Sequence, residues 1–284
     1  MRYPFTLLLV LAAALSAASP ELDQARKFYN LTNFDQSLQI LQSVAAKNGE
    51  VYELMGRNYY MLGDQKRATE ALERAIATEP SNSEYYLWLA RAYGRRAETS
   101  SPFTAPGQAT KARQCFEKAV QLDARNVEAL SDLFEYYMEA PGFLGGGMDK
   151  AVALVPRINA ASPAEGHLAE ARIAEKRKEY ADAEVQLRRA IDCAPQKIGK
   201  LIDLAKFLGR QGRIQEADQS LSRAEAISPG APRLLFARAD LYIHTGRNRT
   251  EARQLLERYL GSQLTPDDPP RSEARKLLKQ AQGS

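Results

Sequence analysis

The stretch VYELMGRNYYMLGDQKRATEALERAIATEP, residues 51–80, decides how this chain folds. Its landmarks are an aromatic residue, a hydrophobic residue followed by a small one, a tyrosine, and then alanine, a large hydrophobic residue, alanine and proline. These landmarks are Tyr52, Met55, Gly56, Tyr59, Ala68, Leu72, Ala75 and Pro80. We expect Gly56 and Ala68 on facing helices of one hairpin, because side chains this small let two helix axes approach to about 8 Å.

The same frame returns along the rest of the chain. Two further copies are clear, at Tyr86, Leu89, Ala90, Tyr93, Ala112, Phe116 and Ala119, and at Leu201, Leu204, Ala205, Leu208, Ala217, Leu221, Ala224 and Pro229. Weaker copies contain Leu130, Leu133, Tyr137, Ala151 and Pro163; Ala171, Ala174, Ala183, Leu187, Ala190 and Pro195; and Ala239, Tyr242, Ala252 and Leu256. One hairpin is too small to bury its own apolar face, so its stability must come from stacking on its neighbours.

This spacing resembles the tetratricopeptide repeat family, in which a unit of about 34 residues forms two antiparallel helices. The resemblance implies an all-α fold, a right-handed α-solenoid of about six helix hairpins over residues 49–266. A degenerate helix pair at 19–48 and a last helix at 267–284 would cap the two ends, as solenoids require.

The first residues have the order of a secretory signal peptide. Arg2 precedes an apolar run from Phe5 to Leu15, and small residues follow at Ser16 and Ala18, which predicts cleavage after residue 18. The run is shorter than the roughly 20 residues of a spanning helix, so an uncleaved anchor is the alternative that we disfavour. We therefore expect a periplasmic or secreted chain that has no membrane span after cleavage, beginning at Ser19.

In the family, the first helix of each hairpin lines a concave groove that usually binds proteins or peptides. The residues that the resemblance places there flank each tyrosine-like landmark, and Trp88 lies on the same face. They are Arg57 and Tyr60; Arg91 and Arg95; Glu135 and Glu139; Arg172 and Lys176; Lys206 and Arg210; and Asp240 and His244. This stripe is mostly basic, which favours an acidic partner segment. The alternative is that Arg91 pairs with Glu135, and Arg95 with Glu139, between neighbouring repeats.

Two hairpins carry insertions between their helices. Tyr93 to Ala112 spans 19 residues and Tyr137 to Ala151 spans 14, against 9 from Tyr59 to Ala68. We expect long loops at 96–110 and 139–149, each with an Ala-Pro-Gly turn, and helix N-caps at Thr110 and Asp149.

The two insertions are expected to touch on one edge and to form an apolar-tipped contact surface. Phe134 replaces the small residue of the frame and is expected to hold its hairpin apart. The candidate contact residues in the loops are Phe103, Pro106, Phe143, Leu144, Gly145, Gly146 and Gly147. A phosphate-binding loop is excluded because GGGMDKA lacks a preceding strand and a Gly-Lys-Ser/Thr ending.

No catalytic or metal-binding set stands out. Cys115 and Cys193 lie two repeats apart, too far to bridge, and both thiols are expected to be buried. Asp240 and His244 share a helix face, but no third ligand is visible, so a surface pair is expected. The net charge of +4 lacks the clustered basic footprint of nucleic-acid binding.

The sequence therefore predicts an exported protein-interaction scaffold and monomer, without a cofactor, that binds a protein or peptide through the groove, the inserted loops or both. One alternative is an assembly factor for a cell-envelope machine. The other is an enzyme or enzyme subunit that uses the inserted loops.

Overall fold

The computed structural model describes residues 20–282, so the expected signal peptide at 1–18 lies outside the described residues. The described chain is helical throughout, with no strand in that range. Its helices are α1 (Pro20–Asn30), α2 (Phe34–Ser43), α3 (Gly49–Met61), α4 (Gln65–Thr78), α5 (Ser83–Thr99), α6 (Ala105–Leu122), α7 (Val127–Glu139), the 3-10 helix η1 (Gly142–Leu144), α8 (Met148–Ala161), α9 (Pro163–Lys176), α10 (Tyr180–Cys193), α11 (Ile198–Arg210), α12 (Ile214–Ile227), α13 (Pro232–His244), α14 (Arg249–Gly261) and α15 (Arg271–Gln282).

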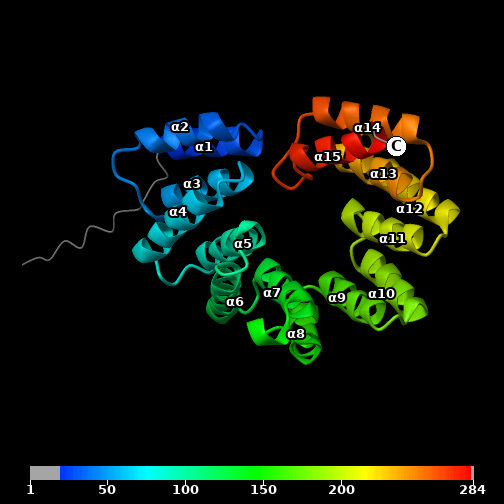
Figure 1. The fold of residues 1–284 in the computed structure, drawn as a ribbon, viewed down its shortest axis with the longest axis horizontal. Helices are drawn as coiled ribbons and strands as arrows, with labels where there is room; N and C mark the ends of the chain where they lie inside the picture. Colours follow the sequence, from blue (N-terminus) through cyan, green and yellow to red (C-terminus); the bar gives the residue numbers. More distant parts are fainter. Residues whose placement is uncertain (1–19, 283–284) are drawn as a thin grey trace, which may run out of the picture.

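The helices pair into six consecutive hairpins, from α3–α4 to α13–α14, with α1–α2 before them and α15 after them. The array curls into a nearly closed ring, with the first helix of each hairpin on the inside and the second on the outside (Figure 1). The two ends come close, because Phe34 and Leu62 near one end line a cavity of about 610 Å³ together with Leu264 and Arg271 near the other. The chain is thus an all-α solenoid, as its repeats predict.

Small residues set the distance between the helices of a hairpin. A Cβ atom on Gly56 of α3 would lie 2.4 Å from Cγ of Leu72 on α4, so only glycine fits at this crossing. Leu72 is itself fully buried. At the equivalent place in the third repeat stands Phe134, which is only 2% exposed, and α7 and α8 contact each other less than the helices of the other five hairpins do. The ring of Phe134 thus occupies the crossing of α7 and α8, as expected if it holds these two helices apart.

The first insertion does not form the expected loop at 96–110. Helix α5 continues to Thr99 and α6 already begins at Ala105, so only residues 100–104 connect them. Pro106 lies in the first turn of α6, where its missing N–H leaves no helical hydrogen bond unmade. The expected Ala-Pro-Gly turn and the N-cap at Thr110 are therefore wrong, and Thr104 precedes the helix instead.

The second insertion is a compact turn built on the three glycines. Pro141 leads into η1, and Gly142 lies in that 3-10 helix without the positive φ that a type II turn requires, so the predicted turn is wrong here too. Gly145 follows η1 with φ +87°. A Cβ on Gly146 would lie 1.8 Å from the carbonyl oxygen of Ala140, a separation that no side chain allows. The amide of Gly147 donates to the carbonyl of Tyr137 at 2.9 Å and closes the turn on α7. Gly147, and not Asp149, is the N-cap of α8.

The two cysteines are free thiols with different surroundings. Cys115 is partly buried, and burial raises the pKa of its thiol to about 12. Cys193 is exposed, so the expectation that both thiols are buried is wrong for this residue. Residue 193 ends α10 at the surface of the array, where no neighbouring repeat covers it. Among residues 20–282, no helix is both long and apolar enough to cross a membrane.

Candidate functional site

A central cavity of about 910 Å³ lies on the concave side of the ring, and residues from both ends of the chain line it. Its wall includes Tyr29 of α1 and Asp267 of the segment before α15, which are far apart in sequence. Between them the wall is formed by residues of the inner helices, notably Arg57, Glu84, Trp88, Arg91, Glu128, Glu165, Lys200 and Arg233. The curvature of the solenoid therefore gathers one residue set from nearly every repeat.

Trp88 is the centre of a stacked cluster at the wall of this cavity. The guanidinium of Arg57 lies 4.4 Å from the centroid of its ring and that of Arg91 lies 4.7 Å away. Tyr60 meets the ring edge-on at 5.7 Å, and Arg57 also lies 4.9 Å from the ring of Tyr29. Such contacts between guanidinium groups and rings contribute about 0.5–1 kcal/mol each at exposed sites. Four of the candidate groove residues thus hold one another in place.

Acidic residues neutralise both arginines of the cluster. Arg91 contacts Asp132 at 2.6 Å and Glu128 at 2.8 Å, whereas Arg57 contacts Glu53 at 3.1 Å. Burial raises the pKa of Asp132 although Arg91 acts to lower it. Burial by itself would lower the pKa of Arg91, but its two acidic partners raise it. The expected pairing of Arg91 with Glu135 is wrong, since Arg91 pairs with Asp132, one turn earlier on α7, and with Glu128, two turns earlier.

Most other basic residues of the groove stripe are likewise paired with acidic residues. Between neighbouring inner helices, Arg172 contacts Glu135 at 3.0 Å, Lys176 contacts Glu139 at 3.5 Å and Arg210 contacts Glu175 at 2.7 Å. Arg95 pairs with Glu98 on its own helix at 3.0 Å and donates to the Tyr60 hydroxyl, so its expected pairing with Glu139 is also wrong. The alternative that groove charges pair between neighbouring repeats is therefore correct, but the pairs that form are not the two that the sequence suggested.

Lys206 is the exception among the basic candidates. It is exposed and has no ion-pair partner within residues 20–282. It stands on the rim of a second cavity, about 350 Å³, between α11 and α13. The floor of that cavity is apolar, with Ile202, Ala205 and Leu241. An apolar cleft with an exposed cation outside any ion pair at its rim suits a peptide that carries an apolar side chain next to a carboxylate.

The opposite rim of the α11–α13 cavity carries Asp240 and His244. Oδ1 of Asp240 lies 3.0 Å from Nδ1 of His244, and the His244 side chain is 68% exposed. Within the described part of the chain, no group of three potential metal ligands comes together. His167 lies apart from this pair, with Nδ1 3.1 Å from Glu170 and 2.9 Å from Gln186.

The inserted segments meet through helix α6 and not tip to tip. The hydroxyl of Tyr136 lies 3.1 Å from the carbonyl oxygen of Ala109 and 2.9 Å from that of Leu144, so it joins α6 to η1. Arg113 of α6 packs along Gly145, where a Cβ would meet its Nε at 2.7 Å. Leu144, Gly145, Gly146 and Gly147 are at least partly buried and serve the turn itself. Phe103 and Phe143 project outward, 96% and 82% exposed.

Several cavity residues have no counterpart among the sequence candidates. Lys200 forms a 2.7 Å ion pair with Glu165 across α9 and α11 and is largely buried. Arg233 and Asp267 also line the central cavity, and Arg233 donates to the carbonyl oxygen of Asp267. These residues lie near the first turns of the inner helices or before α15, away from the tyrosine-like landmarks. Only the curvature of the array brings them together.

Two segments of the chain are similar to a known repeat family. Residues 53–98 and 202–269 match the tetratricopeptide repeat family, so α1, α2, α6 to α10 and α15 lie outside the matched segments. Among curated proteins, no sequence matches the chain significantly.

Solved structures resemble the chain at low sequence identity. A tetratricopeptide repeat protein from Parabacteroides merdae is 14% identical, with a TM-score of 0.59 over 93% of this chain and 98% of its own. A thermophilic tetratricopeptide repeat protein from Thermus thermophilus is 20% identical, with a TM-score of 0.55 over 66% of this chain and 97% of its own. A chain of the APC/C hetero-tetramer Cut9–Hcn1 is 14% identical, with a TM-score of 0.51 over 94% of this chain and 49% of its own. Two segments of the chain therefore match the tetratricopeptide repeat family, and the fold of the described chain is the α-solenoid that such repeats build.

Proposed function

We propose that this chain is an exported scaffold that holds a protein or peptide partner on its concave side. Proteins built from this repeat generally mediate protein–protein interactions and are typically not catalysts. The observation that carries the proposal is the central cavity, whose wall runs from Tyr29 to Asp267 and includes the partly exposed Trp88. A concave surface that draws residues from nearly every repeat suits an extended ligand.

The ion pairs of the groove bear on how such a partner would be recognised. Most of the basic residues expected in the groove are paired with acidic residues of a neighbouring helix, so they offer little attraction to an acidic ligand. Lys206 is exposed, forms no ion pair in the described part of the chain and stands beside an apolar cleft, although it is close enough to Asp203 of the same helix to act to lower the pKa of that carboxyl. The partner segment that fits best places an apolar side chain between α11 and α13 and a carboxylate on Lys206.

Localisation to the periplasm or the extracellular space is part of the proposal. It rests on the order of charged, apolar and small residues over residues 1–18. The starting residue of the exported protein, determined by Edman sequencing, tests it. A chain that begins at Ser19 is expected, and a membrane-held chain that still begins at Met1 would contradict the proposal.

The experiment that tests the α11–α13 cleft as the contact site on the concave side is affinity capture from an envelope extract with three versions of the chain. Wild type should retain one stoichiometric protein, and Lys206→Glu should release most of it because the carboxylate contact turns repulsive. Lys66→Glu, an exposed lysine on the outer helix α4, is the matched control and should capture as wild type does. Equal capture by Lys206→Glu and wild type would exclude this cleft, and catalytic activity of the isolated chain would favour an enzyme.

The loop edge is the second candidate surface. Phe103 and Phe143 are large apolar side chains that are almost fully exposed, and such side chains often mark contact sites. An assembly factor for an envelope machine could use this edge while the concave side binds another component. Double replacement of both phenylalanines by serine separates the two surfaces, because neither residue touches the central cavity.

A further inference from the structure

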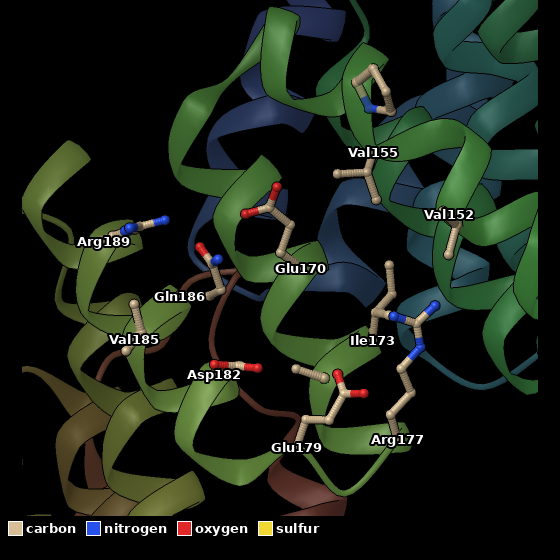
Figure 2. A pocket seen from close by; sticks show the side chains of 12 residues that line it. Val152, Val155, Glu170, Ile173, Arg177, Glu179, Asp182, Val185, Gln186 and Arg189 are labelled. Carbon is tan, nitrogen blue, oxygen red and sulfur yellow. The ribbon is translucent and has the colours of Figure 1, made fainter.

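Another cavity, about 590 Å³, opens on the outer side of the solenoid between α8 and α10 (Figure 2). Helix α9 forms its floor with Ile173, and Val155 of α8 adjoins it. Val152 on the α8 wall is 39% exposed and Val185 on the α10 wall is 47% exposed. Aliphatic side chains on two facing walls of an open cleft present apolar area that a second helix could cover.

The α10 wall carries a stripe with opposite charges at its ends. Asp182, Val185, Gln186 and Arg189 all line the cleft. Their spacing of three, four and seven residues puts them on one helix face. The acid is near the start of α10, the base is seven residues later at about 10 Å along the axis, and the exposed valine lies between them.

Both charged ends of this stripe are free to bind. Within residues 20–282, neither Asp182 nor Arg189 has an ion-pair partner, although both are exposed. The charged residues on the other side of α10 are paired, since Glu184 contacts Arg188 at 2.7 Å and also binds Arg213. The free charges thus lie on the face that lines the cleft.

The remaining charged groups of the cleft leave this pattern in place. Glu179 lies at the same end as Asp182 and adds a second negative charge, against which Arg177 is the only base lining that end. At the other end, Glu170 of the floor is 3.1 Å from Nδ1 of His167. One end of the cleft therefore carries a net negative charge, and Arg189 remains available at the other.

We propose that this cleft binds a second copy of the chain, with α10 of each copy lying antiparallel in the cleft of the other. A two-fold axis near Val185 and Gln186 would bring Asp182 of each copy opposite Arg189 of the other. The same axis would pack the two Val185 side chains together between the α8 walls. Every contact of such an interface occurs twice.

The order of the residues favours a second copy over a foreign helix. A stripe that reads acid, apolar, base along one helix is complementary to itself when reversed, which is the condition for an isologous two-fold interface. A foreign helix would need the same pattern in its own sequence, whereas the chain already supplies it. This dimer would replace the monomer expected from the sequence, and it does not depend on what the concave side binds.

The interface would be small, because one helix crossing buries less area than the roughly 1,200 Å² of standard complexes. The association should therefore be weak and concentration-dependent. It should also weaken as salt rises, since its two ion pairs are at the rim.

Sedimentation equilibrium of the purified chain over a wide concentration range tests the proposal. Wild type should fit a monomer–dimer equilibrium. Asp182→Arg alone and Arg189→Glu alone should each weaken the dimer by at least about tenfold, because each places like charges opposite one another twice. The double variant Asp182→Arg/Arg189→Glu should restore the wild-type constant, since the exchanged charges again match.

A matched control is available on the next outer helix. Arg223 is the tenth residue of α12, as Arg189 is of α10, and it is exposed. Arg223→Glu should leave the dimer constant unchanged, and circular dichroism should show wild-type helicity for every variant. A chain that stays monomeric at all concentrations would overturn the proposal. So would a dimer that neither single variant weakens, or one that the double variant does not restore.

Discussion

The two insertions of this solenoid stand in consecutive hairpins, yet they take opposite forms. The first, between Tyr93 and Ala112, is absorbed by lengthening α5 and α6 to 17 and 18 residues. The second, between Tyr137 and Ala151, folds into η1 and the glycine turn. A proline at the start of a helix allows the first form, whereas three glycines prevent helix continuation in the second. Extra residues in a repeat therefore need not form a loop, because the local helix preferences of those residues decide whether they extend a helix or form a turn.

The largest expected effect is at the glycine turn. Gly146→Ala should lower the free energy of unfolding by at least about 2 kcal/mol, because its Cβ would collide with the backbone carbonyl of Ala140. Chemical denaturation followed by circular dichroism measures this loss. An alanine variant as stable as wild type would mean that the turn is looser than the structure shows.

A smaller loss is expected where the two insertions are joined. Tyr136→Phe removes the hydroxyl that lies between the carbonyls of Ala109 and Leu144, and it should cost about 1 kcal/mol. Tyr180→Phe, on an exposed tyrosine, is the control and should change stability little. Equal effects of the two substitutions would show that the link between α6 and η1 contributes nothing.

The opposite sign is expected in the first insertion. Gly107 lies in the first turn of α6, and nothing stands within 4 Å of the position its Cβ would take. Gly107→Ala should therefore raise the free energy of unfolding by about 0.5 kcal/mol, because alanine loses less backbone entropy on folding. Destabilisation by Gly107→Ala would indicate that residues 100–110 form a loop after all.

The smallest effect on stability is expected at the two exposed rings. Phe103→Ser and Phe143→Ser together should change the free energy of unfolding by no more than about 0.5 kcal/mol. Capture of the partner should persist, since the proposed site is on the concave side. If the double variant folds normally but captures nothing, the loop edge is the binding surface.

The repeat frame predicted the architecture well because each landmark performs a packing task. Gly56, Ala68 and Leu72 are all buried at one helix crossing, and their spacing alone predicts that crossing. The boundaries of the insertions were harder to predict, because Ala-Pro-Gly occurs both in turns and in first helical turns. The sequence pattern predicted a turn at Pro106, whereas this residue lies in the first turn of α6.

The candidate site was predictable only in part. The repeat frame indicates which helix faces line the groove, and on that basis Arg57, Trp88 and Arg91 were correctly predicted to lie there. The ion pairs depend on how far one helix slides along the next, and a shift of one turn exchanged Glu135 for Asp132 as the partner of Arg91. Asp267 reaches the cavity only because the array curls back on itself, which no local pattern encodes.

Site-specific photocrosslinking in cells tests most directly whether a partner occupies the concave side. A photoreactive residue would replace Lys206 at the α11–α13 cleft, Phe143 at the loop edge or Lys66 on the outer face, one at a time. The account predicts one discrete crosslinked product from position 206 and none from position 66. Products from position 143 or 66 in the absence of any from position 206 would contradict it.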